Sequence, residues 1–262
     1  VAATGAGKTN VLWGIADRFM TENPGSRVMV LAHRKELIEQ PLARLEQFWP
    51  DRVPHAGIVM GDTNDCHRRI AIATVQTVGH KNGKRLAEVL RYGRIDLLIT
   101  DECHHVSASS YQNVIAVLKD ANPLLKHLGV TATPERSDKK SLAETYEHES
   151  ANVGVLRLIE DGFLCQPRVH GVKTSIDLSW VSVHGAGGNR DYNQQQLVAA
   201  VETSDCFKLV VKTHMEKAGS RPTIAFVPRV AGAYKLAELL QAEGVAAVAA
   251  DGTTPKVDRE PI

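Results

Sequence analysis

Four short apolar runs rich in β-branched residues recur in the first half of the chain and narrow the choice of fold. The runs are "VMVLAH" from Val28, "IAIATV" from Ile70, "DLLIT" from Asp96 and "LGVTAT" from Leu128. Between them, residues 34–49 and 110–121 place apolar side chains at the three-to-four spacing of amphipathic helices. This alternation predicts an α/β fold in which helices cover a parallel sheet.

A second α/β pattern follows a glycine-rich stretch at residues 185–189. Helices are expected over residues 192–217 and 230–243, and strands over residues 223–228 and 245–252. Since 262 residues are more than one domain usually needs, we expect two domains, the second of them truncated because two strands are too few for a sheet. The predicted regions are a first domain over 1–155, a connecting region over 156–204 and a truncated second domain over 205–262.

The overall charge of the chain provides no global attraction to nucleic acid or to membranes. Its formal net charge is +1, so any basic surface that binds nucleic acid must be local. No apolar run approaches the roughly 20 residues that a membrane-spanning helix requires, so we expect no membrane partner. The four cysteines form no C-x-x-C pair, which favours a reducing, cytoplasmic (intracellular) location.

The stretch "AATGAGKT", from Ala2 to Thr9, is similar to a phosphate-binding loop. In the pattern G-x-x-x-x-G-K-[ST], backbone N–H groups cradle phosphates, the lysine reaches the β and γ phosphates and the hydroxyl holds Mg²⁺. Lys8 and Thr9 fit this pattern, while Ala2 stands where the first glycine is expected. The candidate nucleotide-binding residues are Thr4, Gly5, Ala6, Gly7, Lys8 and Thr9. The alternative is a glycine turn that opens a helix with an exposed lysine.

Two acidic residues directly follow the apolar run at residues 96–100. Ligands gather at the carboxyl ends of the strands in an open α/β sheet. At that edge, Asp101 is expected to hold Mg²⁺ through its water shell, and Glu102 to accept a proton from an attacking water. Lys8, Asp101 and Glu102 are therefore the catalytic candidates, and Thr9 and Asp101 are the metal-binding candidates.

A zinc site at Cys103, His104 and His105 is not expected. Adjacent side chains on an extended segment point to opposite faces, so one tetrahedral ion cannot easily take all three. His104 could instead be an ordinary buried histidine.

At these residues the chain resembles a superfamily 2 helicase or translocase of the DEAD/DEAH-box-like group. In that superfamily the phosphate loop is commonly A-x-T-G-x-G-K-T, which accounts for Ala2. The motif D-E-x-H appears in the DECH spelling, and motif III appears as "TATP" from Thr131. The resemblance implies two RecA-like domains, with ATP and Mg²⁺ as cofactors. It also implies that hydrolysis is coupled to domain movement through His104, Thr131, Ala132 and Thr133.

Three further segments resemble motifs of the same superfamily, in the same order along the chain. Motif Ia matches "VLAHRKELIEQ", motif Ib matches "IATVQTV", and the motif IV region matches "IAFVPRVAGAYKLAELL" followed by "AADGTT". Family members hold the nucleic-acid backbone with motifs Ia and Ib, which suggests Arg34, Thr74 and Gln76 as contacts. Each contact also has a structural alternative, because Arg34 could form an ion pair with a nearby glutamate and the other two could complete hydrogen bonds at a strand end.

The resemblance implies an ATP-dependent nucleic-acid helicase or translocase that couples hydrolysis to closure of two RecA-like domains. DNA is favoured over RNA because the "DECHH" and "TATPER" spellings resemble those of DNA translocases. The alternatives are a phosphate-loop kinase or transferase with a small-molecule acceptor pocket, and a non-catalytic nucleotide-binding remnant. The sequence contains no Q-x-x-G-R-x-x-R, so we expect a fragment that lacks the upstream strand and motifs V and VI and is weakly active or inactive alone.

Overall fold

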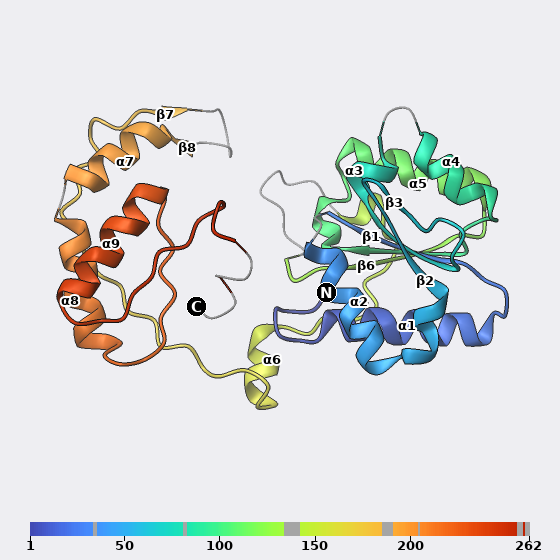
Figure 1. The fold of residues 1–262 in the computed structure, drawn as a ribbon, viewed down its shortest axis with the longest axis horizontal. Helices are drawn as coiled ribbons and strands as arrows, with labels where there is room; N and C mark the ends of the chain where they lie inside the picture. The colour runs from blue at the N-terminus through green and yellow to red at the C-terminus, as the bar shows by residue number, and fades with distance from the viewer. Residues whose placement is uncertain are drawn as a thin grey trace. The chain divides into compact units, whose positions relative to one another are not determined.

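The computed structural model describes residues 1–33, 36–80, 83–133, 142–184, 191–203, 205–255 and 259. The chain forms two compact units, residues 1–167 and residues 168–262 (Figure 1). These two units do not have the same limits as the three regions predicted from the sequence. The predicted boundaries after residues 155 and 204 stay predictions.

The first unit is built on a six-stranded sheet with the strand order β3-β2-β4-β1-β5-β6. Neighbouring strands are parallel, except that β2 and β3 pair antiparallel. The strands are β1 (Val28–Ala32), β2 (Ala56–Met60), β3 (Thr63–Asn64), β4 (Ile70–Thr74), β5 (Leu97–Asp101) and β6 (Lys126–Val130). The four expected strands of this region are therefore confirmed, together with the α/β fold class.

Two core clusters lie on opposite faces of this sheet. Strands β1, β4 and β5 are buried along their whole length, as expected for parallel strands covered on both sides. Along β1, Val28 and Val30 belong to one cluster, while Met29 and Leu31 belong to the other. The first face is covered by α1 (Lys8–Glu22) and α2 (Glu36–Phe48), and the second by α3 (Val75–Val78), α4 (Lys84–Arg91) and α5 (Ser109–Ala121) (Figure 1).

The helices of the first unit include both of the amphipathic segments expected from the sequence. They are α1 (Lys8–Glu22), α2 (Glu36–Phe48), α3 (Val75–Val78), α4 (Lys84–Arg91), α5 (Ser109–Ala121) and α6 (Val155–Glu160), with 3-10 turns η1 (Pro50–His55), η2 (Cys103–His105) and η3 (Leu142–Glu144). Neither α4 nor the strands β2 and β3 were predicted. The burial of β2 alternates along the strand. Its sequence "AGIVM" is short and contains a glycine, so the sequence alone does not indicate a strand there.

The register aligns the carboxyl ends of the central strands in one row. Ala32 of β1 is opposite Thr74 of β4, and Asp101 of β5 is opposite Val130 of β6. Strand β1 also pairs with β5 as far as Thr100, so Asp101 comes next to Ala32. Residues that directly follow these four strands therefore lie at one edge of the sheet, and motifs Ia, Ib, II and III of the first unit each have residues there.

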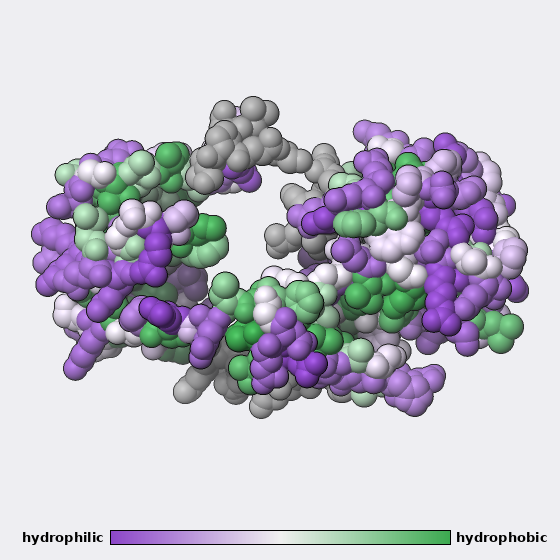
Figure 2. Space-filling view, turned by 90° about the horizontal axis from the view of Figure 1, so that it is seen from below, coloured by the Kyte–Doolittle hydropathy of each residue, from purple (hydrophilic) through white to green (hydrophobic). Residues whose placement is uncertain are grey.

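The second unit contains β7 (Val183–His184), β8 (Asp191–Tyr192), α7 (Gln194–Thr203), α8 (Cys206–Lys217) and α9 (Val230–Ala242). The expected helices are present, with the first divided into α7 and α8. Its small core contains Phe207, Val211 and Leu236 from α8 and α9. Figure 2 shows apolar surface on this unit among hydrophilic side chains.

The prediction of strands over residues 223–228 and 245–252 is wrong. Both segments are described by the structure, and neither has regular strand hydrogen bonding. Ile224, Phe226 and Val248 remain largely exposed. The physical reason is that parallel strands depend on neighbours on both sides, and an isolated pair gains too little burial to order its backbone.

No helix among the residues that the structure describes is both long enough and apolar enough to cross a membrane.

A buried arginine fastens the opposite, amino edge of the sheet. Arg27 is 6% exposed and directly precedes β1. Its backbone N–H donates to Asp96 Oδ2 at 2.9 Å, which ties the start of β1 to the start of β5. Its guanidinium donates to the carbonyl oxygens of Cys66, Arg68, Val89 and Gly93. One side chain thus holds two connections, the one between β3 and β4 and the one between β4 and β5, and its burial lowers the pKa of the guanidinium.

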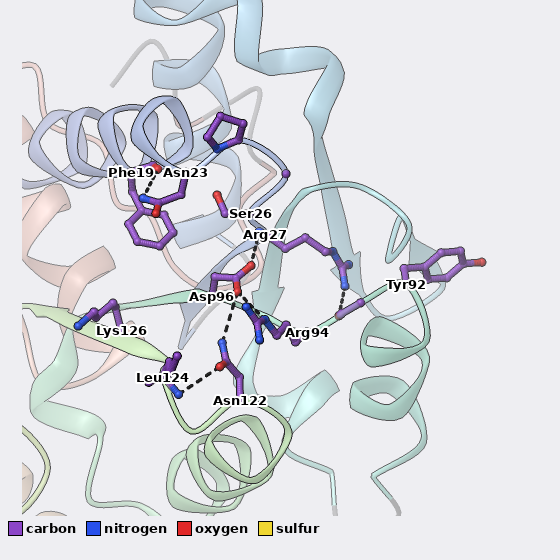
Figure 3. A pocket seen from close by; sticks show the side chains of 13 residues that line it. Phe19, Asn23, Ser26, Arg27, Tyr92, Arg94, Asp96, Asn122, Leu124 and Lys126 are labelled. Carbon is purple, nitrogen blue, oxygen red and sulfur yellow. Dashed lines mark hydrogen bonds and ion pairs between the residues drawn. The ribbon is translucent and has the colours of Figure 1, made fainter.

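A cavity of about 580 Å³ opens beside this arginine (Figure 3). Asp96, at its centre, accepts hydrogen bonds from the Arg27 backbone, from Arg94 and from Asn122. The Asn122 amide also donates to the Ile95 carbonyl at 2.9 Å. Because these polar groups are already bonded to protein, and because the motifs end at the other edge, we interpret the cavity as a gap around a structural network rather than as a ligand site.

Replacing Arg27 should destabilise the first unit strongly. Arg27→Ala leaves four carbonyl groups without their donor, two of them in the buried residues Cys66 and Val89, so we expect the free energy of unfolding to fall by about 3 kcal/mol. Arg94→Ala is the matched control, since its guanidinium is 61% exposed and pairs with the same Asp96. It should cost less than about 1 kcal/mol. Urea unfolding of both variants measures the difference, and equal losses would contradict the role given to Arg27.

Candidate functional site

Residues 1–3 hold the start of the phosphate loop between two neighbouring segments. The Ala2 N–H donates to the Thr131 carbonyl at 2.9 Å, and the Ala3 N–H donates to the Val153 carbonyl at 2.9 Å. Ala2 and Val153 also form a parallel β-bridge. The loop therefore begins beside the carboxyl end of β6, at the edge where the motifs end.

The loop from Thr4 to Gly7 has the bends that a phosphate-binding backbone requires. Gly5 has φ 89° and Gly7 has φ 73°, both in the left-handed region that a Cβ atom disfavours. Gly7 caps α1, and its carbonyl accepts the N–H groups of Asn10 and Val11. Within the described residues, no atom lies within 4 Å of the position a Gly7 Cβ would take. The start of α1 is therefore uncrowded on the side of the Gly7 Cβ position, and the first N–H groups of a helix are the ones that can bind an anion.

The phosphate loop and the acidic pair meet at this edge. Lys8 Nζ lies 3.4 Å from the Ala2 carbonyl oxygen, so its ammonium folds back over the loop. Asp101 ends β5 and is 8% exposed. Burial raises the pKa of its carboxyl, while the Glu102 N–H that it accepts and the positive charge of Lys8 oppose that rise. The structure therefore brings Lys8 and Asp101 into one electrostatic environment.

The residues at this edge fit a magnesium nucleotide. Thr9 is the second residue of α1 and is partly buried. Hydroxyl and carboxylate oxygens are the protein ligands that Mg²⁺ prefers, and a divalent cation would favour the ionised form of the buried Asp101. Together with the open loop at Gly7, these groups could hold the phosphates and their metal ion.

Glu102 lies at a strained turn. Its backbone angles are φ 48° and ψ 51°, and it is the only non-glycine residue with positive φ in the part of the chain that the structure describes. Such a conformation costs about 1–3 kcal/mol and persists only where the surroundings fix it. The turn ends β5 and directs the carboxylate toward His104, whose Nδ1 lies 3.3 Å from Glu102 Oε2.

His104 connects the acidic motif with motif III. Its Nδ1 atom lies 2.9 Å from Thr131 Oγ1 and 3.5 Å from Thr133 Oγ1. Thr131 Oγ1 also accepts the Thr133 N–H at 3.1 Å, with Ala132 between the two threonines. A carboxylate can only accept, so a hydrogen bond with Glu102 requires the proton on Nδ1, which can then be donated either to Glu102 or to a threonine hydroxyl. Glu102, Thr131 and Thr133 therefore compete for one hydrogen bond from His104.

The extended geometry assumed for residues 103–105 is wrong. These residues form the 3-10 turn η2, because the left-handed backbone at Glu102 ends the strand. Cys103 turns into the core, whereas the His104 and His105 rings lie side by side with centroids 4.1 Å apart. Among the described residues, no group of three histidine, cysteine, aspartate or glutamate side chains is arranged to hold a metal ion.

The structure places two of the expected nucleic-acid contacts at the same edge. Thr74 is 5% exposed, and its hydroxyl lies 2.9 Å from Thr77 Oγ1. Gln76 is exposed, and its amide donates to the His33 carbonyl at 2.6 Å. Arg34 lies outside the described residues. The roles of all three in binding nucleic acid stay predictions.

Two further histidines at this edge were not among the sequence candidates. His33 directly follows β1, and its ring stacks on His105 with centroids 4.4 Å apart and planes at 22°. The available signal was positional: each histidine closely follows one of two strands that turn out to be neighbours. Only the strand order, which the sequence pattern does not specify, brings them together.

A polar cluster lies in the core behind the acidic motif. His127 Nε2 lies 2.9 Å from Thr100 Oγ1 and 3.1 Å from Tyr146 Oη. Burial lowers the pKa of His127 from 6.5 to about 4, and burial raises the pKa of Cys103 to about 11. A Cβ on Gly129 would lie 2.8 Å from Cys103 Sγ, so this part of β6 requires a glycine. The cluster supports the turn that carries Glu102.

The depressed pKa of His127 predicts a loss of stability in acid. Between pH 6.5 and about 4 the unfolded chain binds a proton that the folded chain rejects, so the free energy of unfolding falls as the pH falls through that window. The expected contribution is on the order of 3 kcal/mol. His127→Gln should remove it, whereas Tyr146→Phe should keep most of it because burial is the main cause. Urea unfolding at a series of pH values tests this, and an unchanged pH dependence in His127→Gln would contradict it.

The sequence of the chain is similar to a known protein family and to several known proteins. Residues 1–136 match the family described as "Type III restriction enzyme, res subunit". The chain is 26% identical over 272 residues to the candidate ATP-dependent helicase IRC3 of Saccharomyces cerevisiae, covering 99% of this chain and 38% of that protein. It is 27% identical over 225 residues to the endonuclease subunit of the type I restriction enzyme EcoAI of Escherichia coli, covering 81% of this chain and 27% of that protein.

Among solved structures, the chain is similar to the Hef helicase domain of Pyrococcus furiosus. The TM-score is 0.43 and the sequence identity is 23%, with 52% of this chain and 30% of that chain covered. The chain thus spans well under half the length of the proteins compared here.

Proposed function

The chain belongs to the family of type III restriction enzyme res subunits, among the superfamily 2 helicases that its motifs resemble, and we propose that it carries the ATP-hydrolysing site of a helicase or translocase. One observation carries the proposal: Lys8, Asp101 and Glu102 converge where the phosphate loop meets the end of β5. That edge is where an open α/β sheet binds nucleotides.

In the proposed mechanism each group has one task. The loop N–H groups and the Lys8 ammonium bind the β and γ phosphates, while Thr9 and Asp101 hold the metal ion. Bound Mg²⁺ neutralises charge that develops on the transferred phosphoryl group. Glu102 orients the attacking water and accepts its proton, and His104 senses this change because its Nδ1 lies 3.3 Å from the carboxylate.

Hydrolysis would be coupled to movement through motif III. When Glu102 accepts a proton, its carboxylate becomes a poorer acceptor for the His104 N–H, which favours donation to Thr131. Thr131 in turn bonds to the Thr133 backbone. We propose that this exchange communicates the state of the nucleotide to a second RecA-like domain that closes over it.

The assignment of Lys8 and Glu102 predicts different defects in their variants. Lys8→Ala should weaken ATP binding about 10- to 100-fold, because a charge-assisted contact to phosphate is lost. Glu102→Gln should leave ATP binding nearly intact and lower kcat about 10²- to 10⁴-fold, because the general base is lost. Calorimetric titration and phosphate release in the full-length protein measure both quantities.

The matched control is Lys126→Ala, which removes an exposed lysine at the amino edge of the sheet. It should leave both ATP affinity and kcat unchanged. Equal loss of ATP affinity in the Lys8 and Glu102 variants would overturn the assignment of separate roles. Unaltered protein that binds ATP without turnover would favour the non-catalytic alternative, and phosphate transfer to a small molecule would favour the kinase alternative.

We further propose that the nucleic acid is DNA. The E. coli relative is named as a restriction enzyme subunit, and the DECHH spelling points in the same direction. Contacts from motifs Ia and Ib would lie at the edge that carries Gln76, next to the nucleotide site.

A phosphate contact by Arg34 predicts a change in salt dependence. Arg34→Ala should weaken binding to single-stranded DNA uniformly across sequences and lower the slope of log K against log salt by about one unit. Arg18→Ala, an exposed arginine that pairs with Glu22, is the control and should leave the slope unchanged. Fluorescence anisotropy between low and high salt measures the slope. The same slope in Arg34→Ala and unaltered protein would favour the surface ion pair instead, and tighter binding to RNA of the same sequence would overturn the preference for DNA.

A further inference from the structure

Three histidine rings form a continuous stack along the carboxyl edge of the sheet. His33 stacks on His105 with centroids 4.4 Å apart, and His105 contacts His104 with centroids 4.1 Å apart. The plane angles are 22° for the first pair and 46° for the second. The stack therefore ends at His104, whose Nδ1 faces both Glu102 and Thr131.

The other end of the stack leads to an exposed side chain. The Gln76 amide donates to the His33 carbonyl at 2.6 Å. Gln76 lies in α3, which directly follows β4, whereas His33 directly follows β1. A force on Gln76 would thus act on the backbone that carries the first ring of the stack.

Each contact in this series joins neighbouring strand ends. The sheet order β4-β1-β5-β6 places Gln76 beside His33, His33 beside His105, and His104 beside Thr131. The series crosses the nucleotide site, because Glu102 lies between the third and fourth strand ends. This series of contacts joins the exposed Gln76 to the proposed general base Glu102.

The state of His33 also indicates that its ring is held for stacking. Its Nδ1 atom is buried and has no hydrogen-bond partner in the part of the chain that the structure describes. A buried polar atom without a partner is unfavourable, so other contacts must fix the ring in this place. The stacking on His105 is one such contact.

We propose that His105 is a positioning residue that couples nucleic-acid binding at motif Ia and motif Ib to the general base Glu102, an inference that rests on the proposed function. The switchable element is the His104 N–H, which bonds either to Glu102 or to Thr131. A shift of His33 moves the His105 ring, and that ring sets the orientation of His104. Nucleic acid would thereby select the His104 orientation in which Glu102 is free to accept the proton of the attacking water.

The test compares two substitutions at His105 with a control, all in the full-length protein. His105→Ala removes the ring, whereas His105→Phe keeps a flat ring in the stack. His148→Ala removes an exposed histidine of the same unit and should behave as the unaltered protein. The measured quantities are kcat and the KM for ATP, each with and without saturating single-stranded DNA, and the midpoint of thermal unfolding.

The expected result is a loss of stimulation rather than of nucleotide binding. In His105→Ala, the ratio of stimulated to basal kcat should fall about fivefold or more, the lower end of typical coupling between sites. The KM for ATP should change less than the ratio does, and His105→Phe should recover most of the stimulation. His33→Ala should reproduce the loss, and the His33→Ala/His105→Ala double variant should be no worse than either single variant, because both act through one stack.

Distinct results would overturn the inference. A stimulation ratio in His105→Ala equal to that of the unaltered protein would remove His105 from the coupling. So would equal reductions of basal and stimulated kcat with a lower unfolding midpoint, which would indicate structural support alone. Multiplying losses in the double variant would exclude a shared stack. If unaltered protein hydrolyses ATP without any stimulation by nucleic acid, the proposed function itself fails, a result that these variants do not influence.

Discussion

The burial of the parallel sheet on both faces determines where this protein can carry out chemistry. The apolar side chains of strands β1, β4 and β5 fill the two core clusters, so the polar residues of these strands, Thr74, Thr100 and Asp101, stand at their carboxyl ends. Polar side chains are possible only where the strands end. The register gathers four such ends at one edge, so residues far apart in sequence become neighbours without any long-range loop.

The two edges of the sheet have opposite character. At the amino edge, the guanidinium of the buried Arg27 donates to backbone carbonyls on two connections, and the partly buried Asp96 accepts the Arg27 N–H and two side-chain donors. At the carboxyl edge, Lys8, Asp101 and His104 have contacts that can be exchanged for a ligand or for one another. The cavity at the amino edge therefore does not mark the functional site in spite of its volume. The candidate site is recognised instead by hydrogen bonds at the carboxyl edge that can be exchanged.

The sequence predicted the position of a residue where that position depends on its own strand or turn alone. Lys8 follows a glycine turn, and Asp101 ends an apolar run, so their positions could be predicted without knowing the strand order. The contact between His33 and His105 could not be predicted, because it depends on β1 and β5 being neighbours.

Two further errors have local physical causes. The left-handed backbone at Glu102 replaced an expected extended segment by a turn. The strands expected over residues 223–228 and 245–252 lack the neighbours that would order them, so apolar alternation alone was insufficient.

At residue 102 the backbone conformation favours glycine for stability, whereas the proposed activity requires the carboxylate of Glu102. A glycine at residue 102 would relieve a left-handed strain of about 1–3 kcal/mol, partly offset by about 0.5–1 kcal/mol of additional chain entropy in the unfolded state. The same change would remove the carboxylate. A search for heat-resistant variants of this protein that ignored turnover would therefore tolerate or favour glycine there, and would accumulate well-folded molecules without the carboxylate that we propose as the general base.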